Sequence, residues 1–151
     1  MAAKYEQLKL DNQLCFPLYA ASRKIVSKYT PVLKPLGITY TQYLVFLVLW
    51  EQDGIKVGDL CRRLYLDNGT VTPLLKKMEA AGYVTRTRED EDERVVTVRL
   101  TDAGRDLQEK AADVPFCVGS CITNSGTGAA VPTEEEMKQL YTLLYKFIDV
   151  L

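Results

Sequence analysis

A strong helical signal occupies residues 64–82, whose sequence is LYLDNGTVTPLLKKMEAAG. Asp67 or Asn68 can accept the free backbone amides at a helix start, and Gly82 stands where a left-handed residue commonly ends a helix. Between these ends, apolar residues fall on one helical face: Val71, Leu74, Leu75 and Met78. The other face is mostly polar: Thr70, Thr72, Lys76 and Lys77. The stretch therefore predicts an amphipathic helix.

A shorter helix is predicted just before it, with Arg62 and Arg63 on the outer face. Its apolar face has four members: Val57, Leu60, Cys61 and Leu64. Two helices joined by a turn of about four residues, the second ending in glycine, form a helix-turn-helix.

The segments that follow predict a β-hairpin. Residues 83–88 and 95–100 alternate like strands, and the polar residues 89–94 join them. A helix-turn-helix followed by a hairpin is a winged helix, so the predicted fold is mainly α with a small β-hairpin wing. Such a fold places a polar helix in the major groove of DNA and a basic hairpin on the flanking backbone or minor groove. The alternative is a small α/β bundle with a solvated polar face, which the wing in register with its helices disfavours.

Composition narrows the function further. The 151 residues carry a net charge of −1, so any affinity for DNA must come from local clusters of Lys and Arg. The chain has no histidine, which excludes Ser-His and Cys-His catalysis and histidine metal sites. The first ten residues are not a secretory signal, and the longest apolar run, Tyr43 to Trp50, is far shorter than the ~20 residues of a membrane span. We therefore expect a cytoplasmic protein without membrane contact, in which the four cysteines are not structural disulfides.

Helices are also predicted on both sides of the winged helix. One begins at Asp11 or Asn12, accommodates Pro17 only in its first turn, and is bent and ended by Pro31, Pro35 and Gly37. A buried helix begins at Thr39 or Thr41 and stops at Asp53-Gly54. After the wing, a helix opens at Thr101 or Asp102 and is interrupted by Pro115, and residues 117–132 resemble a mobile loop or a frayed helix end. Thr133 and Glu136 form a capping box that opens the last helix.

The last helix has an apolar stripe too broad for a small monomer. The stripe consists of Met137, Leu140, Tyr141, Leu144, Phe147, Ile148 and Leu151. We interpret the outer helices as a homodimer interface, because two recognition helices related by a two-fold axis can bind the two half-sites of a pseudo-palindromic operator in double-stranded DNA. The chain is thus divided into an N-terminal dimerisation helix with the sensor cysteine (1–40), a winged helix (41–101) and C-terminal dimerisation helices (102–151).

Three motifs resemble the MarR family of dimeric winged-helix regulators. They are residues 66–74, the Asp-Glu-Arg of residues 92–94, and the Leu-Thr-Asp-Ala-Gly of residues 100–104. The stretch 12–16, together with Tyr19, Tyr29 and Tyr40, is similar to one branch of that family, the organic hydroperoxide resistance repressors. The resemblance extends from residue 10 to residue 115 and weakens afterwards.

The resemblance implies a repressor that is bound to its operator when reduced and is released when an organic hydroperoxide oxidises it. The implied sensor is Cys15, and the hydroxyls that hydrogen-bond its thiolate are those of Tyr29, Tyr40 and Tyr19, in part from the partner subunit. General chemistry agrees, because the thiolate is the form that attacks a peroxide and a helix N-terminus favours the anion. A lone cysteine is otherwise most often a small core residue.

The other cysteines are assigned by the same resemblance. Some members of the branch capture the oxidised sensor in an intersubunit disulfide, which implies Cys117 or Cys121 as the resolving thiol. Their spacing would also suit a metal pair, but no further ligands accompany it, so neither a metal nor a cofactor is expected. Cys61 lies on an apolar helix face and is expected to be inert.

The expected DNA contacts come from the recognition helix and the wing. They are Asp67, Asn68, Thr70, Thr72, Lys76, Lys77, Arg86, Arg88 and Arg94, of which the resemblance places Arg94 in the minor groove. Each Lys or Arg could instead be a solvated surface charge, and for Thr72 and Lys77 that alternative is competitive. The five acids of residues 89–93 would be repelled by phosphate, and Asp92 alone has a proposed role, orienting the wing through Arg94.

Two rival functions are distinguishable. A regulator of the same family that binds a small aromatic ligand would be released from DNA by a phenol, and Cys15→Ser would not change this. A thiol peroxidase would turn over continuously with a reductant and have no operator. The absence of a thioredoxin-like βαβ pattern counts against an enzyme.

Overall fold

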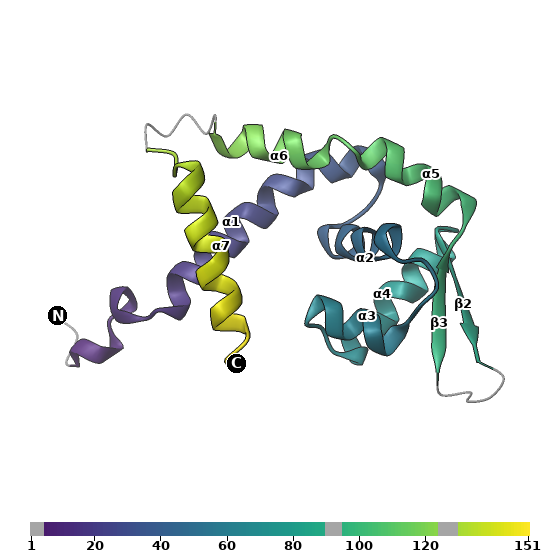
Figure 1. Ribbon diagram of the computed structural model, residues 1–151, viewed down its shortest axis with the longest axis horizontal. Helices are drawn as coiled ribbons and strands as arrows, with labels where there is room; N and C mark the ends of the chain where they lie inside the picture. Colours follow the sequence, from purple (N-terminus) through teal and green to yellow (C-terminus); the bar gives the residue numbers. More distant parts are fainter. Residues whose placement is uncertain (1–4, 90–94, 124–129) are drawn as a thin grey trace.

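The computed structural model describes residues 5–89, 95–123 and 130–151. Its centre is a winged helix made of three helices and a three-stranded antiparallel sheet (Figure 1). The helices are α2 (Tyr40–Glu51), α3 (Val57–Leu64) and α4 (Asn68–Ala80), and the strands are β1 (Ile55–Lys56), β2 (Val84–Arg88) and β3 (Val96–Leu100). The predicted fold class is confirmed.

The recognition helix α4 begins and ends as local chemistry requires. Of the two candidate caps it uses Asp67, whose Oδ1 accepts the Thr70 backbone amide at 2.8 Å. Gly82 ends the helix with a φ of +78°. The turn between α3 and α4 contains Tyr65 at a φ of +52°, the one positive value at a described non-glycine residue. These features hold α4 at a defined angle to α3.

The sheet has the order β1-β3-β2. The wing hairpin pairs Val84 with Leu100 and Arg86 with Val98. The sequence pattern did not predict β1, in which Ile55 pairs with Val98. A strand of two residues is too short to show an alternation of apolar and polar side chains, so β1 is recognised only from its pairing with β3.

One hydrophobic core runs from Leu33 to Val118. Helix α2, capped by Thr39 in a capping box with Gln42, lies at its centre and buries Val45 and Phe46 completely. This core crosses both predicted boundaries, at residues 40 and 101. The predicted segments 1–40, 41–101 and 102–151 therefore share one core, and the division between them stays a proposal about their functions.

The first long helix, α1 (Cys15–Leu33), begins later than predicted. Asn12 does not cap it: Leu14 stands at the N-cap position, Asn12 ends a 3-10 turn, and its side-chain amide donates to the Glu6 carbonyl at 2.8 Å. The preceding residues form two short 3-10 turns, η1 (Glu6–Leu8) and η2 (Leu10–Asn12). Pro17 falls in the first turn of α1, as required. The helix continues through Pro31 and ends in the 3-10 turn η3 (Lys34–Leu36).

For residues 117–132 the sequence left two alternatives open, a mobile loop or a frayed helix end; residues 117–123 are helical, so the loop alternative is wrong there. Helix α5 (Asp102–Ala111) is capped by Thr101, and a second helix, α6 (Val114–Thr123), follows it directly. Pro115 lies in the first turn of α6, where its missing amide is not needed. Val114 and Val118 are buried, and α6 packs on α1. This packing outweighs the weak helix propensity of the Gly and Ser residues. Residues 124–129 of the predicted loop lie outside the described residues.

The last helix, α7 (Glu134–Ile148), has the predicted capping box at Thr133 and Glu136. In Figure 1, α7 and the first half of α1 lie on the side opposite to β2 and β3, and α5 and α6 run along one edge. No single helix in the described part of the chain is long and apolar enough to cross a membrane; the bent pair Cys15–Leu36 and Tyr40–Glu51 meets the criteria of length and composition only when taken together.

Candidate redox site and DNA-binding surface

Cys15 is the first residue of α1, and its thiol is free and exposed. Tyr19 follows one helical turn later, on the same face. The Tyr19 hydroxyl accepts a hydrogen bond from Arg23 Nη1 at 2.8 Å, and the Arg23 guanidinium lies 5.6 Å from the centre of the Tyr19 ring. The thiol therefore has a phenol and a cation on its own helix, about one and about two turns away.

Tyr29 and Tyr40 form a second cluster, with ring centres 4.7 Å apart. Tyr43 adjoins them, 5.9 Å from Tyr29. Burial, and then the nearness of Tyr29, raise the pKa of the Tyr40 hydroxyl. Burial, followed by Tyr29 and Tyr40, likewise raises the pKa of Tyr43. The hydroxyls of Tyr40 and Tyr43 therefore remain protonated at neutral pH and can act as hydrogen-bond donors.

The structure does not bring Cys15 and the Tyr29–Tyr40 cluster together within one chain. Cys15 and Tyr29 both lie on α1 and are fourteen residues apart. At a rise of 1.5 Å per residue this is about 21 Å. Contact between the thiol and these hydroxyls therefore requires a second copy of the chain.

Cys117 and Cys121 lie one turn apart on α6, and both are free and exposed. The start of α1 and the whole of α6 are well separated in Figure 1, so pairing with Cys15 also requires another chain. Among the described residues, no three His, Cys, Asp or Glu side chains could hold a metal ion together.

Cys61 is buried, with 7% of its surface exposed. Burial, followed by the charge of Asp67, raises the pKa of its thiol. The Sγ atom donates to Asn68 Oδ1 at 3.2 Å. A protonated, buried thiol is a poor nucleophile, in agreement with the inert role expected for Cys61.

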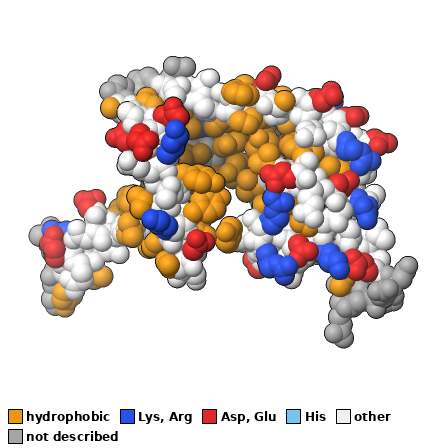
Figure 2. All heavy atoms as spheres, viewed as in Figure 1, with side chains coloured by type: hydrophobic (Ala, Val, Ile, Leu, Met, Phe, Trp, Pro, Cys, Tyr) orange, Lys and Arg blue, Asp and Glu red, His pale blue; other side chains and the backbone are white. Residues whose placement is uncertain are grey.

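Figure 2 shows hydrophobic side chains gathered over α7 and in the hollow between α7 and the winged helix. No residue of α7 is buried in the single chain. Leu140 and Tyr141 of the predicted stripe are 47% and 64% exposed. Contiguous apolar surface of this kind marks an interaction site.

The outer face of α4 presents several of the predicted DNA contacts. Thr70, Lys76 and Lys77 are exposed, and Thr72 is half-buried. The Asp67 carboxylate is occupied in the helix cap, since it accepts the Thr70 amide and hydroxyl, both at 2.8 Å. Hydrogen bonds from the Thr70 side chain and then its backbone lower the pKa of Asp67.

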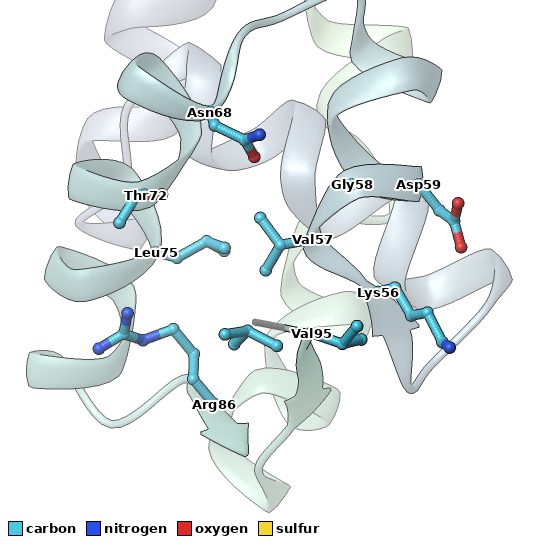
Figure 3. Close-up of a pocket in the computed structure, with 10 residues that line it drawn as sticks. Lys56, Val57, Gly58, Asp59, Asn68, Thr72, Leu75, Arg86 and Val95 are labelled. Carbon is cyan, nitrogen blue, oxygen red and sulfur yellow. The ribbon is translucent and has the colours of Figure 1, made fainter. Parts of the chain in front are cut away.

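A groove of about 430 Å³ lies between α4, the start of α3 and the wing (Figure 3). Asn68 and Leu75 project into it from α4, and Val57 projects into it from α3. Arg86 extends from β2 toward the last turns of α4. The groove is thus bounded by the two elements that are expected to contact DNA.

The predicted arginines of the wing are placed differently from one another. Arg88 is exposed, and Arg94 lies outside the described residues. Arg86 forms an ion pair with Glu79 of α4 at 2.6 Å. Of the acidic run, Glu89 accepts a hydrogen bond from Thr97 and pairs with Lys56 at 3.3 Å, whereas residues 90–93 lie outside the described part. Sequence reasoning missed Glu79; an acid in the last turn of α4, close in sequence to a wing arginine, was the available signal.

The known proteins that this chain resembles are transcriptional regulators. A family model described as transcriptional regulator SarA/Rot matches residues 27–111. The organic hydroperoxide resistance transcriptional regulator of Bacillus subtilis (strain 168) is 45% identical over 151 residues, which cover 100% of this chain and 97% of that protein.

AbfR, a protein of Staphylococcus epidermidis, is similar in three solved states. Reduced AbfR bound to DNA has a TM-score of 0.74 and 36% identity, covering 97% of this chain and 96% of that one. Overoxidized AbfR bound to DNA has a TM-score of 0.73 and 37% identity, with 97% and 98% covered. Disulfide-formed AbfR has a TM-score of 0.63 and 37% identity, with 95% of each chain covered.

Proposed function

Because the chain belongs to the MarR family of winged-helix transcriptional regulators, in the branch of the organic hydroperoxide resistance regulators, we propose that it is a homodimeric repressor that leaves its operator when a hydroperoxide oxidises Cys15. Its relatives are transcriptional regulators and not enzymes. DNA-bound relatives of the same fold support operator binding by this chain.

The proposal rests on the distance along α1 between the Cys15 thiol and the cluster of Tyr29 and Tyr40. Cys15 is exposed at the start of this helix, and the Tyr29–Tyr40 cluster lies about 21 Å further along. If two copies pack their α1 helices in antiparallel fashion, each thiol meets the hydroxyls of its partner. The exposed apolar residues of α1 and α7 supply the surface for such a dimer.

The proposed oxidation takes place in two steps. The Cys15 thiolate attacks the terminal oxygen of the hydroperoxide and breaks the O–O bond, which gives a sulfenic acid and, after protonation, an alcohol. The thiol of Cys117 or Cys121 in the other subunit attacks the sulfenic sulfur, forming a disulfide and releasing water. AbfR is known in a disulfide form, and also on DNA in an overoxidized form. This contrast favours the disulfide, rather than added oxygen, as the releasing step.

Hydrogen bonds at the base of the wing connect the start of α5 to the segment between α4 and β2. Through them, a disulfide on α6 can affect the DNA-binding elements. The Thr101 hydroxyl at the start of α5 donates to the Gly82 carbonyl at 2.6 Å, and the Thr101 amide donates to the Tyr83 carbonyl at 3.0 Å. A shift of α5 and α6 would therefore move the end of α4 and the wing. The spacing of half-sites is fixed by the duplex, so small displacements are sufficient for release.

Cys15→Ser is expected to bind operator DNA as tightly as the reduced wild type and to ignore hydroperoxide. Oxidation should weaken binding by the wild type by about 5- to 150-fold, the usual range of allosteric coupling. The measurement is fluorescence anisotropy with a labelled duplex, with and without an organic hydroperoxide. Cys61→Ser is the control and should respond like the wild type. A Cys15→Ser protein that still dissociates on oxidation would remove Cys15 from the mechanism, whereas release of both proteins by a phenol alone would favour the aromatic-ligand rival.

A further inference from the structure

Glu79 and Arg86 connect the recognition helix to the wing. Glu79 Oε2 accepts hydrogen bonds from Arg86 Nε at 3.0 Å and from Nη2 at 2.6 Å. Glu79 Oε1 accepts the Arg86 backbone amide at 3.1 Å. One carboxylate on α4 therefore receives three donors from Arg86 of β2, a residue that lines the groove in Figure 3.

The backbone explains why Arg86 offers its amide to α4. Strand β2 is an edge strand, and Arg86 is paired with Val98. Ladder bonds join Glu89 N to Val95 O and Thr101 N to Tyr83 O. Because antiparallel ladder bonds alternate, the Arg86 amide points to the free edge. Glu79 caps this edge at the point nearest to the recognition helix.

The charges indicate a role beyond stability. Glu79 lies in the last turn of α4, where the helix dipole disfavours an anion, on an element that must approach phosphates. Hydrogen bonds from the Arg86 side chain lower the pKa of the Glu79 carboxyl, so the acid stays ionised beside its partner. The negative charge of Glu79 by itself weakens the affinity for DNA. A role of Glu79 in positioning the wing would offset this loss and account for its presence.

We propose that Arg86 is a positioning residue and not a phosphate contact, and that its ion pair with Glu79 fixes the angle between recognition helix and wing at which both engage the operator. The inference rests on the proposed operator binding and deepens it. Arg88, two residues along the same face of β2 and exposed, is then the phosphate contact of this strand.

The two interpretations of Arg86 predict opposite signs for Glu79→Gln. If Arg86 contacts phosphate, releasing it from Glu79 and removing a negative charge should tighten binding. If the pair positions the wing, Glu79→Gln should weaken binding, by about tenfold. Arg86→Gln should weaken it by a similar factor, and the double variant should be no worse than either single variant, because both remove one interaction.

The test uses the full-length reduced protein and a duplex selected by the wild type from a random-sequence library. The affinity of each variant is measured from low to high salt. Arg88→Gln, the matched control, should lower the salt slope of log affinity by about 0.9, the value for one lost phosphate contact, whereas Arg86→Gln should leave the slope unchanged. Amide exchange at Arg86 without DNA should accelerate in Glu79→Ala.

The outcomes separate the two claims. If no duplex is enriched by the wild type, operator binding itself fails. If a duplex is enriched, then tighter binding by Glu79→Gln, or a reduced salt slope in Arg86→Gln, overturns the positioning role. Slow exchange at Arg86 in Glu79→Ala overturns it even where a variant is too unstable for DNA titration.

Discussion

Gly104→Ala is expected to destabilise the protein by about 3 kcal/mol, at the upper end of the cost of overpacking a buried site. A Cβ at Gly104 would overlap the Tyr83 carbonyl oxygen and lie 3.0 Å from a methyl group of Leu100. The Gly104 carbonyl also accepts the indole N–H of Trp50 at 3.0 Å, so α5, the wing and α2 meet at this point. The clash is with backbone, and no side-chain rotation relieves it.

The measurement is thermal unfolding followed by circular dichroism. For a chain of 151 residues this loss should lower the melting temperature by about 10 °C. Gly58→Ala is the control, because Gly58 is also helical but has nothing within 4 Å of its added Cβ. That variant should be as stable as the wild type or slightly more stable. Equal melting temperatures for Gly104→Ala and the wild type would contradict the close packing of α5 on the wing.

Leu140→Asp is expected to dissociate the proposed dimer. Leu140 is 47% exposed on the stripe of α7, so the substitution should hardly affect the fold of a single chain. At the centre of a subunit interface, however, it would bury a charge. The dimer dissociation constant should rise by at least about 30-fold, corresponding to a hot-spot loss of 2 kcal/mol. Operator affinity should fall with it, because a monomer contacts one half-site only.

Sedimentation velocity across a concentration series measures this effect. Thr142→Asp is the matched control, since it places the same charge on the opposite face of α7, where the Thr142 hydroxyl donates to the Lys138 carbonyl of its own helix. The control should remain dimeric. If Leu140→Asp sediments like Thr142→Asp, the apolar stripe is not the dimer interface.

Elements specified by local chemistry were predictable. Asp67 and Gly82 mark the start and the end of α4, because the Asp67 side chain accepts a backbone amide and Gly82 adopts a positive φ. Thr133 and Glu136 likewise form the capping box expected from their spacing. In each case the residues that determine the structure are neighbours in sequence.

Features that depend on distant residues were not predictable in the same way. Helix α6 forms because Val114 and Val118 pack on α1, and the sequence of α6 alone resembles a loop. Asn12 does not cap α1 because it ends the 3-10 turn η2, and Leu14 stands at the N-cap position. Gly104 was noticed only as part of a family motif, since the need for glycine comes from the Tyr83 carbonyl.

The candidate redox site could be predicted as a set of residues but not as a geometry. The thiol and the phenols lie on one chain about 21 Å apart, so their meeting depends on a second copy. For Arg86, charge and position suggested DNA, whereas its contact with Glu79 appears only once α4 and β2 are packed together.

In the proposed mechanism, oxidation joins Cys15 to α6 of the other subunit as the DNA is released. Dimers that combine an isotopically light and a heavy subunit, treated with one equivalent of hydroperoxide, can be digested without reduction and analysed by mass spectrometry alongside DNA binding. We expect disulfides between Cys15 of one isotope and Cys117 or Cys121 of the other, accumulating at the rate at which DNA is lost. Release of DNA while Cys15 remains an unmodified thiol, or with a disulfide between Cys117 and Cys121 alone, would contradict the account.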